Sequence, residues 1–209
     1  MDSQTAVNSI SKRRAYSSDL YGQTNANHPL RVGLWHEGEF SWEYPKKNLD
    51  NIPTRPLLSL LSIHHTSDYE ILKMRLSTKN NAKQKVKIIV QDTVYGLKCN
   101  TSFYSPNEKA IMRYTVGGVT MMGGSISGRD MAQYCVLNQE GLNTLKLKES
   151  LQQGSLPLAW IAKEEICSIY ILESEITNIE SEEIIIWSFH GHTENQVSNL
   201  KNNILSKYV

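Results

Sequence analysis

The sequence contains little cysteine, and its cysteines form no recognisable pair. Three are present, Cys99, Cys135 and Cys167, and no C-x-x-C motif occurs. A structural zinc site or a disulfide framework is expected to show closely spaced or even-numbered cysteines, so this pattern indicates neither. We interpret all three as buried, reduced thiols, and we predict no metal site and no cofactor.

Long hydrophobic runs are absent as well. Residues 1–23 lack the apolar run of a signal peptide, and no stretch approaches the roughly 20 apolar residues that cross a bilayer. The 22 basic and 21 acidic residues leave a net charge of +1, so no overall field attracts nucleic acid or anionic lipid. We expect a cytoplasmic protein that binds neither nucleic acid nor membranes.

The composition does support one folded core. Hydrophobic residues make up 40% of the 209 positions and charged residues 21%. Residues 1–27 are polar and rich in Ser and Asn, which predicts a flexible N-terminal arm. We expect a β-sandwich domain over residues 28–191 and a helix over residues 192–209.

Alternating apolar and polar residues predict many short strands. Val32 and Leu34 alternate with polar or small neighbours, as do Phe40 and Trp42, and Gly38 lies in the turn between the two runs, which indicates a β-hairpin. A second hairpin is predicted around the glycine pair at 117–118. Further strands are predicted at 57–65, 131–137, 166–172 and 183–189.

Two runs with charged residues on one face resemble neighbouring strands of a half-exposed sheet. They cover residues 72–76 and 86–90, with a turn predicted at 78–82. The glycine-rich stretch 123–128 lacks the G-K-[ST] ending of a phosphate-binding loop and the central serine of a nucleophile elbow. We interpret this stretch as a flexible loop between strands.

A change of period marks the end of the chain. Val197, Leu200 and Ile204 recur at helical spacing, and Thr193 can cap the helix. A helix this short is marginal alone in water, so the stripe must dock on the sandwich or on a partner, with Lys201 expected on the exposed face. The whole pattern predicts an all-β, antiparallel β-sandwich with one C-terminal α-helix.

Three segments carry a resemblance to a known family: RVGLWHEGEFSW (31–42), TSFYSPNEKAIMRYTVGG (101–118) and WSFHGHTENQVSNL (187–200). They resemble the N-terminal, supersandwich-like β-sandwich domain of bacterial glucoamylase-like enzymes, glycoside hydrolase family 15. The first segment matches the family pattern at Arg31, Gly33, Trp35, Gly38, Phe40, Ser41 and Trp42. Gln153-Gly154-Ser155 is similar to a further family segment.

The resemblance implies the sandwich fold without the family's reaction. In that family a helical barrel follows the sandwich and carries two catalytic carboxylates, whereas this sequence ends at Val209. The family buries one face of the sandwich against the barrel. In a chain without the barrel we expect that face to be covered by a second copy, by another protein or by the N-terminal arm.

Several residues are candidates for binding or chemistry. Trp35 and Trp42 can stack on sugar rings, although their strand positions also fit core packing. The pairs His64-His65 and His190-x-His192 suggest metal ligands, but no acidic or cysteine ligand accompanies them at a recognised spacing. The glutamates near 37–43 and 173–183 lie in predicted turns and wet strand faces, so a solvated surface is favoured over a catalytic pair.

Surface charge is segregated along the chain. The 73–87 region is locally basic and the 173–183 region is acidic. These regions are interpreted either as two exposed strand faces or as complementary patches for self-association or for a partner.

The function expected from the sequence is that of a non-catalytic module for protein interaction or self-assembly. Trp35, Trp42, Leu200 and Ile204 are its candidate ligand or interface residues. A glucan-binding protein is the first alternative, and a remnant or subunit of a split glucan hydrolase is the second.

Overall fold

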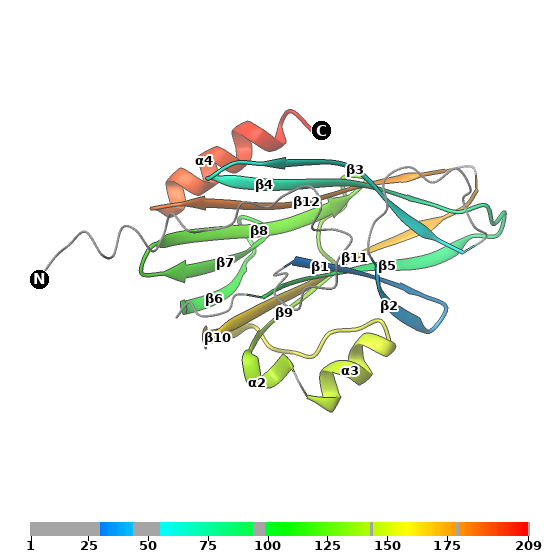
Figure 1. Cartoon of the computed structure of the whole chain (residues 1–209), viewed down its shortest axis with the longest axis horizontal. Coiled ribbons are helices and arrows are strands. Elements are labelled where there is room, and N and C mark those ends of the chain that lie inside the picture. The colour runs from blue at the N-terminus through cyan, green and yellow to red at the C-terminus, as the bar shows by residue number, and fades with distance from the viewer. Residues whose placement is uncertain (1–29, 44–54, 94–98, 143, 179, 209) are drawn as a thin grey trace, which may run out of the picture.

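The computed structural model describes residues 30–43, 55–93, 99–142, 144–178 and 180–208. The predicted arm at 1–27 lies outside these residues. Two antiparallel sheets face each other, and helices lie on the outer side of both (Figure 1). This arrangement confirms the predicted all-β sandwich with a C-terminal helix.

The smaller sheet, called sheet A here, has five strands. Its spatial order is β2 (Glu39–Glu43), β1 (Leu30–His36), β5 (Gln84–Thr93), β11 (Ile166–Ile176) and β9 (Gln133–Asn138). The larger sheet, sheet B, has seven strands. Its order is β10 (Ile161–Glu164), β6 (Cys99–Ser105), β7 (Ala110–Thr115), β8 (Gly118–Ile126), β12 (Glu182–Gly191), β4 (Tyr69–Ser77) and β3 (Leu57–His65).

Among the described residues, three helices cover the sheets. The short helices α2 (Gln139–Leu142) and α3 (Leu145–Gln152) lie on sheet A, and α4 (Glu194–Leu205) lies on sheet B (Figure 1). The Thr193 side chain accepts a hydrogen bond from the Gln196 amide, as expected of the predicted cap. In the described part of the chain, no helix has the length and apolarity that a bilayer span requires.

Helices α2 and α3 are absent from the sequence-based prediction. Their apolar signal is weak, because α3 buries only Leu147 and Leu151 in eight residues. Such a short helix depends on the sheet beneath it. Leu147 and Leu151 pack against Ile89, Ile169 and Ile171 of sheet A, and this cluster is what stabilises the helix.

The hairpin of β1 and β2 forms as predicted. Trp35 lies opposite Phe40, and Gly33 lies opposite Trp42. Glu37 and Gly38 both have positive φ, 51° and 83°, which is the geometry of the tight turns that match the twist of a hairpin.

Strands β4 and β5, predicted to be neighbours, belong to different sheets. β4 pairs with β3 and β12, whereas β5 pairs with β1 and β11. The chain crosses from sheet B to sheet A between them, at residues 78–83. The face of β5 expected to be wet is instead covered by α3, and Ile89 there is fully buried.

The glycine-rich stretch is a strand rather than a flexible loop. β8 continues to Ile126, and only the two residues after it form a turn. A Cβ on Gly123 would lie 2.6 Å from the Trp187 ring, so this position needs the space that glycine leaves. The Tyr170 hydroxyl donates a 2.7 Å hydrogen bond to the Gly123 carbonyl, which joins the two sheets here.

Candidate binding surface

Trp35 is half-buried on the outer face of sheet A and is held in place on two sides. Its Nε1 donates a 2.8 Å hydrogen bond to the Gln152 carbonyl at the end of α3. Gly154 has a positive φ of 63°, and a Cβ there would lie 2.7 Å from the Trp35 ring. The Lys87 ammonium, 5.3 Å from the centre of the ring, donates to the Gly154 carbonyl at 2.7 Å. The indole therefore fastens α3 and the segment after it to the sheet.

Trp42 lies on the same face. Phe40 meets its ring edge-on at a centroid distance of 4.9 Å, and the Arg31 guanidinium lies 4.3 Å from the ring centre. Gly33 allows this packing, because a Cβ there would lie only 2.5 Å from Phe40. Trp35, Phe40 and Trp42 thus belong to the cluster beneath α3.

Leu200 and Ile204 project from α4 onto the outer face of sheet B. With Leu205 and Tyr208 they pack against a buried cluster that contains Trp187, Phe189 and Val197. Val197 is fully buried. The apolar stripe of α4 is therefore covered by the chain's own sheet.

The sequence predicted an exposed Lys201, but this side chain is largely buried. Only 12% of its side chain is accessible, and its ammonium lies 2.6 Å from a carboxylate oxygen of Glu108 in the turn between β6 and β7. It also donates to the Glu108 carbonyl at 3.0 Å. Ser198 donates a further hydrogen bond to the Glu108 carboxylate at 2.8 Å. The hydrogen bond from Lys201 holds the pKa of Glu108 below its ordinary value.

The candidate pairs His64-His65 and His190-x-His192 do not gather into a metal site. The His64 ring packs edge-on to Tyr208, and His190 contacts the hydroxyls of Thr120 and Ser188. Within the described ranges, no three residues among His, Cys, Asp and Glu are placed to hold a metal ion together.

The acidic and basic regions of the sequence pair with each other inside the chain. Adjacent strands place lysines beside glutamates, because β4 borders β12 and β5 borders β11. The resulting ion pairs are Lys73–Glu183, Lys87–Glu173 and Lys83–Glu175. The basic and acidic regions are therefore complementary, but they pair with each other within one chain rather than with a second molecule.

Glu182 is the most enclosed of these glutamates. Burial raises its pKa, but hydrogen bonds from Ser127, Arg129 and Ser174 outweigh burial and keep the pKa below its ordinary value. A general acid for glycoside hydrolysis needs the opposite shift, a carboxyl that stays protonated near neutral pH.

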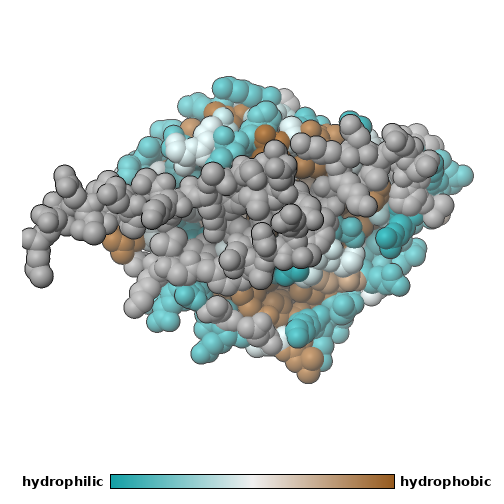
Figure 2. Space-filling view, viewed as in Figure 1, coloured by the Kyte–Doolittle hydropathy of each residue, from teal (hydrophilic) through white to brown (hydrophobic). Residues whose placement is uncertain are grey.

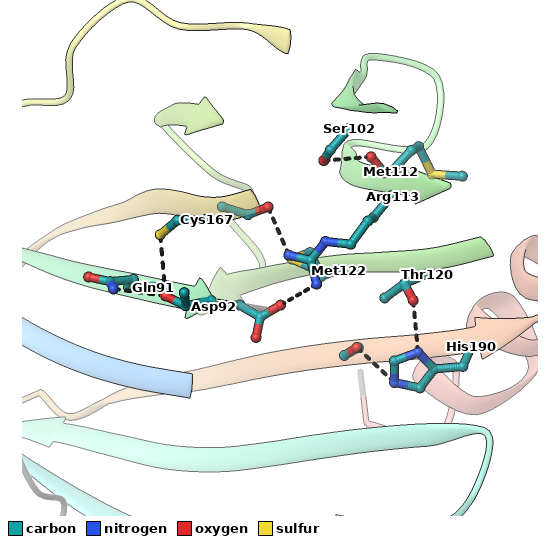
Figure 3. Close-up of polar contacts among 12 residues, drawn as sticks. Gln91, Asp92, Ser102, Met112, Arg113, Thr120, Met122, Cys167 and His190 are labelled. Carbon is teal, nitrogen blue, oxygen red and sulfur yellow. Dashed lines mark hydrogen bonds and ion pairs between the residues drawn. The ribbon is translucent and has the colours of Figure 1, made fainter. Parts of the chain in front are cut away.

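A buried polar cluster occupies one end of the space between the sheets (Figure 3). The Arg113 guanidinium of β7, only 4% exposed, lies 2.9 Å from a carboxylate oxygen of Asp92 on β5. It also donates to the Ser168 hydroxyl of β11 at 3.1 Å. One side chain of sheet B therefore binds two strands of sheet A.

The same end of sheet B carries a transverse polar row. Ser102, Arg113, Thr120 and His190 lie opposite one another on four adjacent strands. The Ser188 hydroxyl lies 3.3 Å from Nε2 of His190, and the Thr120 hydroxyl lies 3.0 Å from Nδ1. The position that a carboxylate occupies in a Ser-His-Asp triad is thus taken by a neutral hydroxyl. These contacts give the polar groups of the row hydrogen-bonding partners.

The cysteine side chains that are described are sheltered. Cys135 and Cys167 are fully buried on β9 and β11, and burial raises the pKa of each thiol to about 12. Thiols with so high a pKa are unreactive at neutral pH.

Three large apolar side chains are exposed where the chain joins the two sheets. Leu158, Trp160 and Ile161 are 86%, 64% and 63% exposed, and we call them the exposed strip. Figure 2 shows hydrophobic surface on the side of the molecule where Figure 1 places β9, α2 and α3. Exposed tryptophan with apolar neighbours is typical of a binding surface.

The backbone under the exposed strip is fixed at both sheet edges. The Val136 amide of β9 donates a 2.8 Å hydrogen bond to the Ala159 carbonyl. Ile161 then pairs with Phe103 of β6, so the segment passes from the edge of sheet A to the edge of sheet B. The strip is therefore presented from an anchored segment.

The sequence-based prediction missed Trp160. One signal was available in the sequence. Leu158-Ala159-Trp160-Ile161 is an apolar run that follows Pro157, and it is too short and lacks the alternation expected of a core strand. A residue pattern does not show directly which side chains are accessible to solvent. Trp35 and Trp42 were chosen as candidates over Trp160 because they lie in a regular predicted hairpin.

Comparisons with known proteins give no assignment. No family model matches the chain, and no curated protein matches its sequence.

Proposed function

We propose that this chain is a non-catalytic β-sandwich module that binds a protein surface, either a second copy or another protein. The exposed strip carries the proposal. Helices of the chain itself pack on the outer faces of both sheets. Among the described residues, Leu158, Trp160 and Ile161 are three of the six large apolar side chains that stay exposed, and they lie together in the sequence. Tryptophan at the centre of such a surface commonly provides much of the binding energy.

Two features support a non-catalytic role. Four glutamates of the acidic region, at 173, 175, 182 and 183, are paired with lysine or arginine neighbours rather than with each other. The two ring nitrogens of His190 contact the hydroxyls of Thr120 and Ser188. The buried, protonated thiols favour a reducing compartment, and on that ground we propose a cytoplasmic location.

The test is the effect of Trp160→Ser on association. We expect wild-type protein to associate at micromolar concentration in sedimentation velocity, and Trp160→Ser to raise the dissociation constant by about tenfold or more, as loss of an interface tryptophan does. Val116→Ser is the matched control, because Val116 is 92% exposed and lies in the turn between β7 and β8. Equal association of both variants would contradict the proposal.

Carbohydrate binding is the second candidate, favoured by the accessible indole of Trp160, since aromatic faces contact sugar rings. A relation to the glucoamylase-like sandwich domain, resting on the three resembling segments, remains a proposal, as does an origin in a split glucan hydrolase. A monomer that binds malto-oligosaccharide in calorimetry, with binding lost in Trp160→Ser, would favour this candidate over protein association.

A further inference from the structure

The exposed apolar residues of the molecule are unevenly distributed. Three of the six large apolar side chains that are exposed form the strip, whereas Leu61 on β3, Val116 in the β7–β8 turn and Leu145 at the start of α3 have no such neighbour in the sequence. Single exposed apolar side chains are normal on a protein surface and offer little area to a partner. Over the ranges that the structure describes, the strip is thus the one stretch of sequence in which several large apolar side chains are exposed.

This distribution limits how two copies can meet. A head-to-tail contact would require the strip to dock on a different apolar surface of the neighbouring copy. Leu61, Val116 and Leu145 each offer a single exposed side chain, which is less apolar area than the strip presents. A two-fold contact needs only the strip itself, because each copy covers the strip of the other.

The charges beside the strip fit the same geometry. Lys163 and Glu164 follow Ile161 after Ala162, and both are exposed. The residues that border the strip thus carry both positive and negative charge. Across a two-fold axis, the lysine of each copy can lie near the glutamate of the other copy. A partner of one sign, such as nucleic acid or an anionic bilayer, would gain from the lysine and lose from the glutamate.

We propose that two copies of this chain associate about a two-fold axis passing beside Trp160, strip against strip. This inference rests on the proposed function and specifies its partner. The anchored backbone at Ala159 and Ile161 reduces the ordering that association requires, which favours binding by a surface of only a few side chains.

Cross-linking at the border tests the two-fold axis. Lys163→Cys, in a Cys99→Ser background, places one reactive thiol beside the strip without changing its apolar residues. Cys135 and Cys167 are fully buried and stay unreactive. A two-fold contact brings the two introduced thiols together, so a short bismaleimide should give covalent dimers at micromolar protein, much faster than in a Val116→Cys control. Adding Trp160→Ser should abolish the difference.

The outcomes separate the two proposals. Rapid cross-linking that depends on Trp160 supports the two-fold dimer. Association in sedimentation velocity with cross-linking no faster than in the Val116→Cys control overturns the two-fold axis but leaves protein binding through the strip intact. A wild-type protein that stays monomeric in sedimentation velocity overturns the dimer, and the proposed function would then require a different protein as partner.

Discussion

Arg113 shows how one residue can connect two sheets. Its guanidinium is almost fully enclosed, and Asp92 supplies the opposite charge from the facing sheet. A buried ion pair often contributes little net stability, because removing two charges from water offsets most of their attraction. Leaving one charge without its partner is much more costly, which makes this pair sensitive to single substitutions.

We therefore expect Asp92→Ala to lower the free energy of unfolding by about 3 kcal/mol, as stranding a buried charge does. The double variant Asp92→Ala with Arg113→Met should lose less, because no charge remains buried without a partner. Denaturant titration of the wild type, both single variants and the double variant measures the coupling. Strictly additive losses would show that Arg113 finds other compensation when Asp92 is removed.

At the scale of elements, α4 shows two kinds of attachment. Its apolar stripe packs on sheet B, and Lys201 and Ser198 bind Glu108 in the turn between β6 and β7 of the same sheet. The helical period of Val197, Leu200 and Ile204 was readable from the sequence. The contact of Lys201 was not, because its acceptor lies 93 residues earlier in the chain.

Leu200→Asp should destabilise the protein by about 2 kcal/mol, because it places an unpaired carboxylate against the apolar cluster of sheet B. Asn199→Asp introduces the same charge one position earlier, where the side chain is exposed, and should leave the melting temperature nearly unchanged. Thermal unfolding of the two variants and the wild type decides the point. If Leu200→Asp has the same melting temperature as the wild type, α4 does not contribute to the cooperative fold.

The Glu108–Lys201 contact should make the docking of α4 dependent on pH. The pKa of Glu108 in the folded protein lies below its ordinary value of 4.5. Its stabilising contribution is therefore complete above pH 4.5 and is lost as the pH falls through the lower, folded-state pKa. Glu108→Gln should flatten the dependence of unfolding free energy on pH below 4.5 relative to the wild type. Parallel curves for both proteins would exclude this contact as a source of acid sensitivity.

For the whole molecule, the sequence predicted strands better than it predicted their partners. Alternation located the hairpin at Gly38 and the strands that became β3, β11 and β12. Alternation cannot tell whether two successive strands share a sheet, and β4 and β5 were wrongly paired for that reason. The glycines of β8 were read as a loop because their role, room for Trp187 and Tyr170, depends on residues far away in the chain. The exposure of Trp160 depends likewise on the whole fold.

The pairing of β5 with β11 has a consequence for the order of events during synthesis. Thr93 and Cys167 are neighbours in sheet A although 74 residues separate them. While the chain emerges from the ribosome, one edge of β5 stays without its strand until β11 has been made. Pairing over such distances is slow, because loop-closure entropy must be overcome before the contacts form. The newly made β5, with its run of buried aliphatic residues, is therefore open to pairing with another copy until β11 has been made.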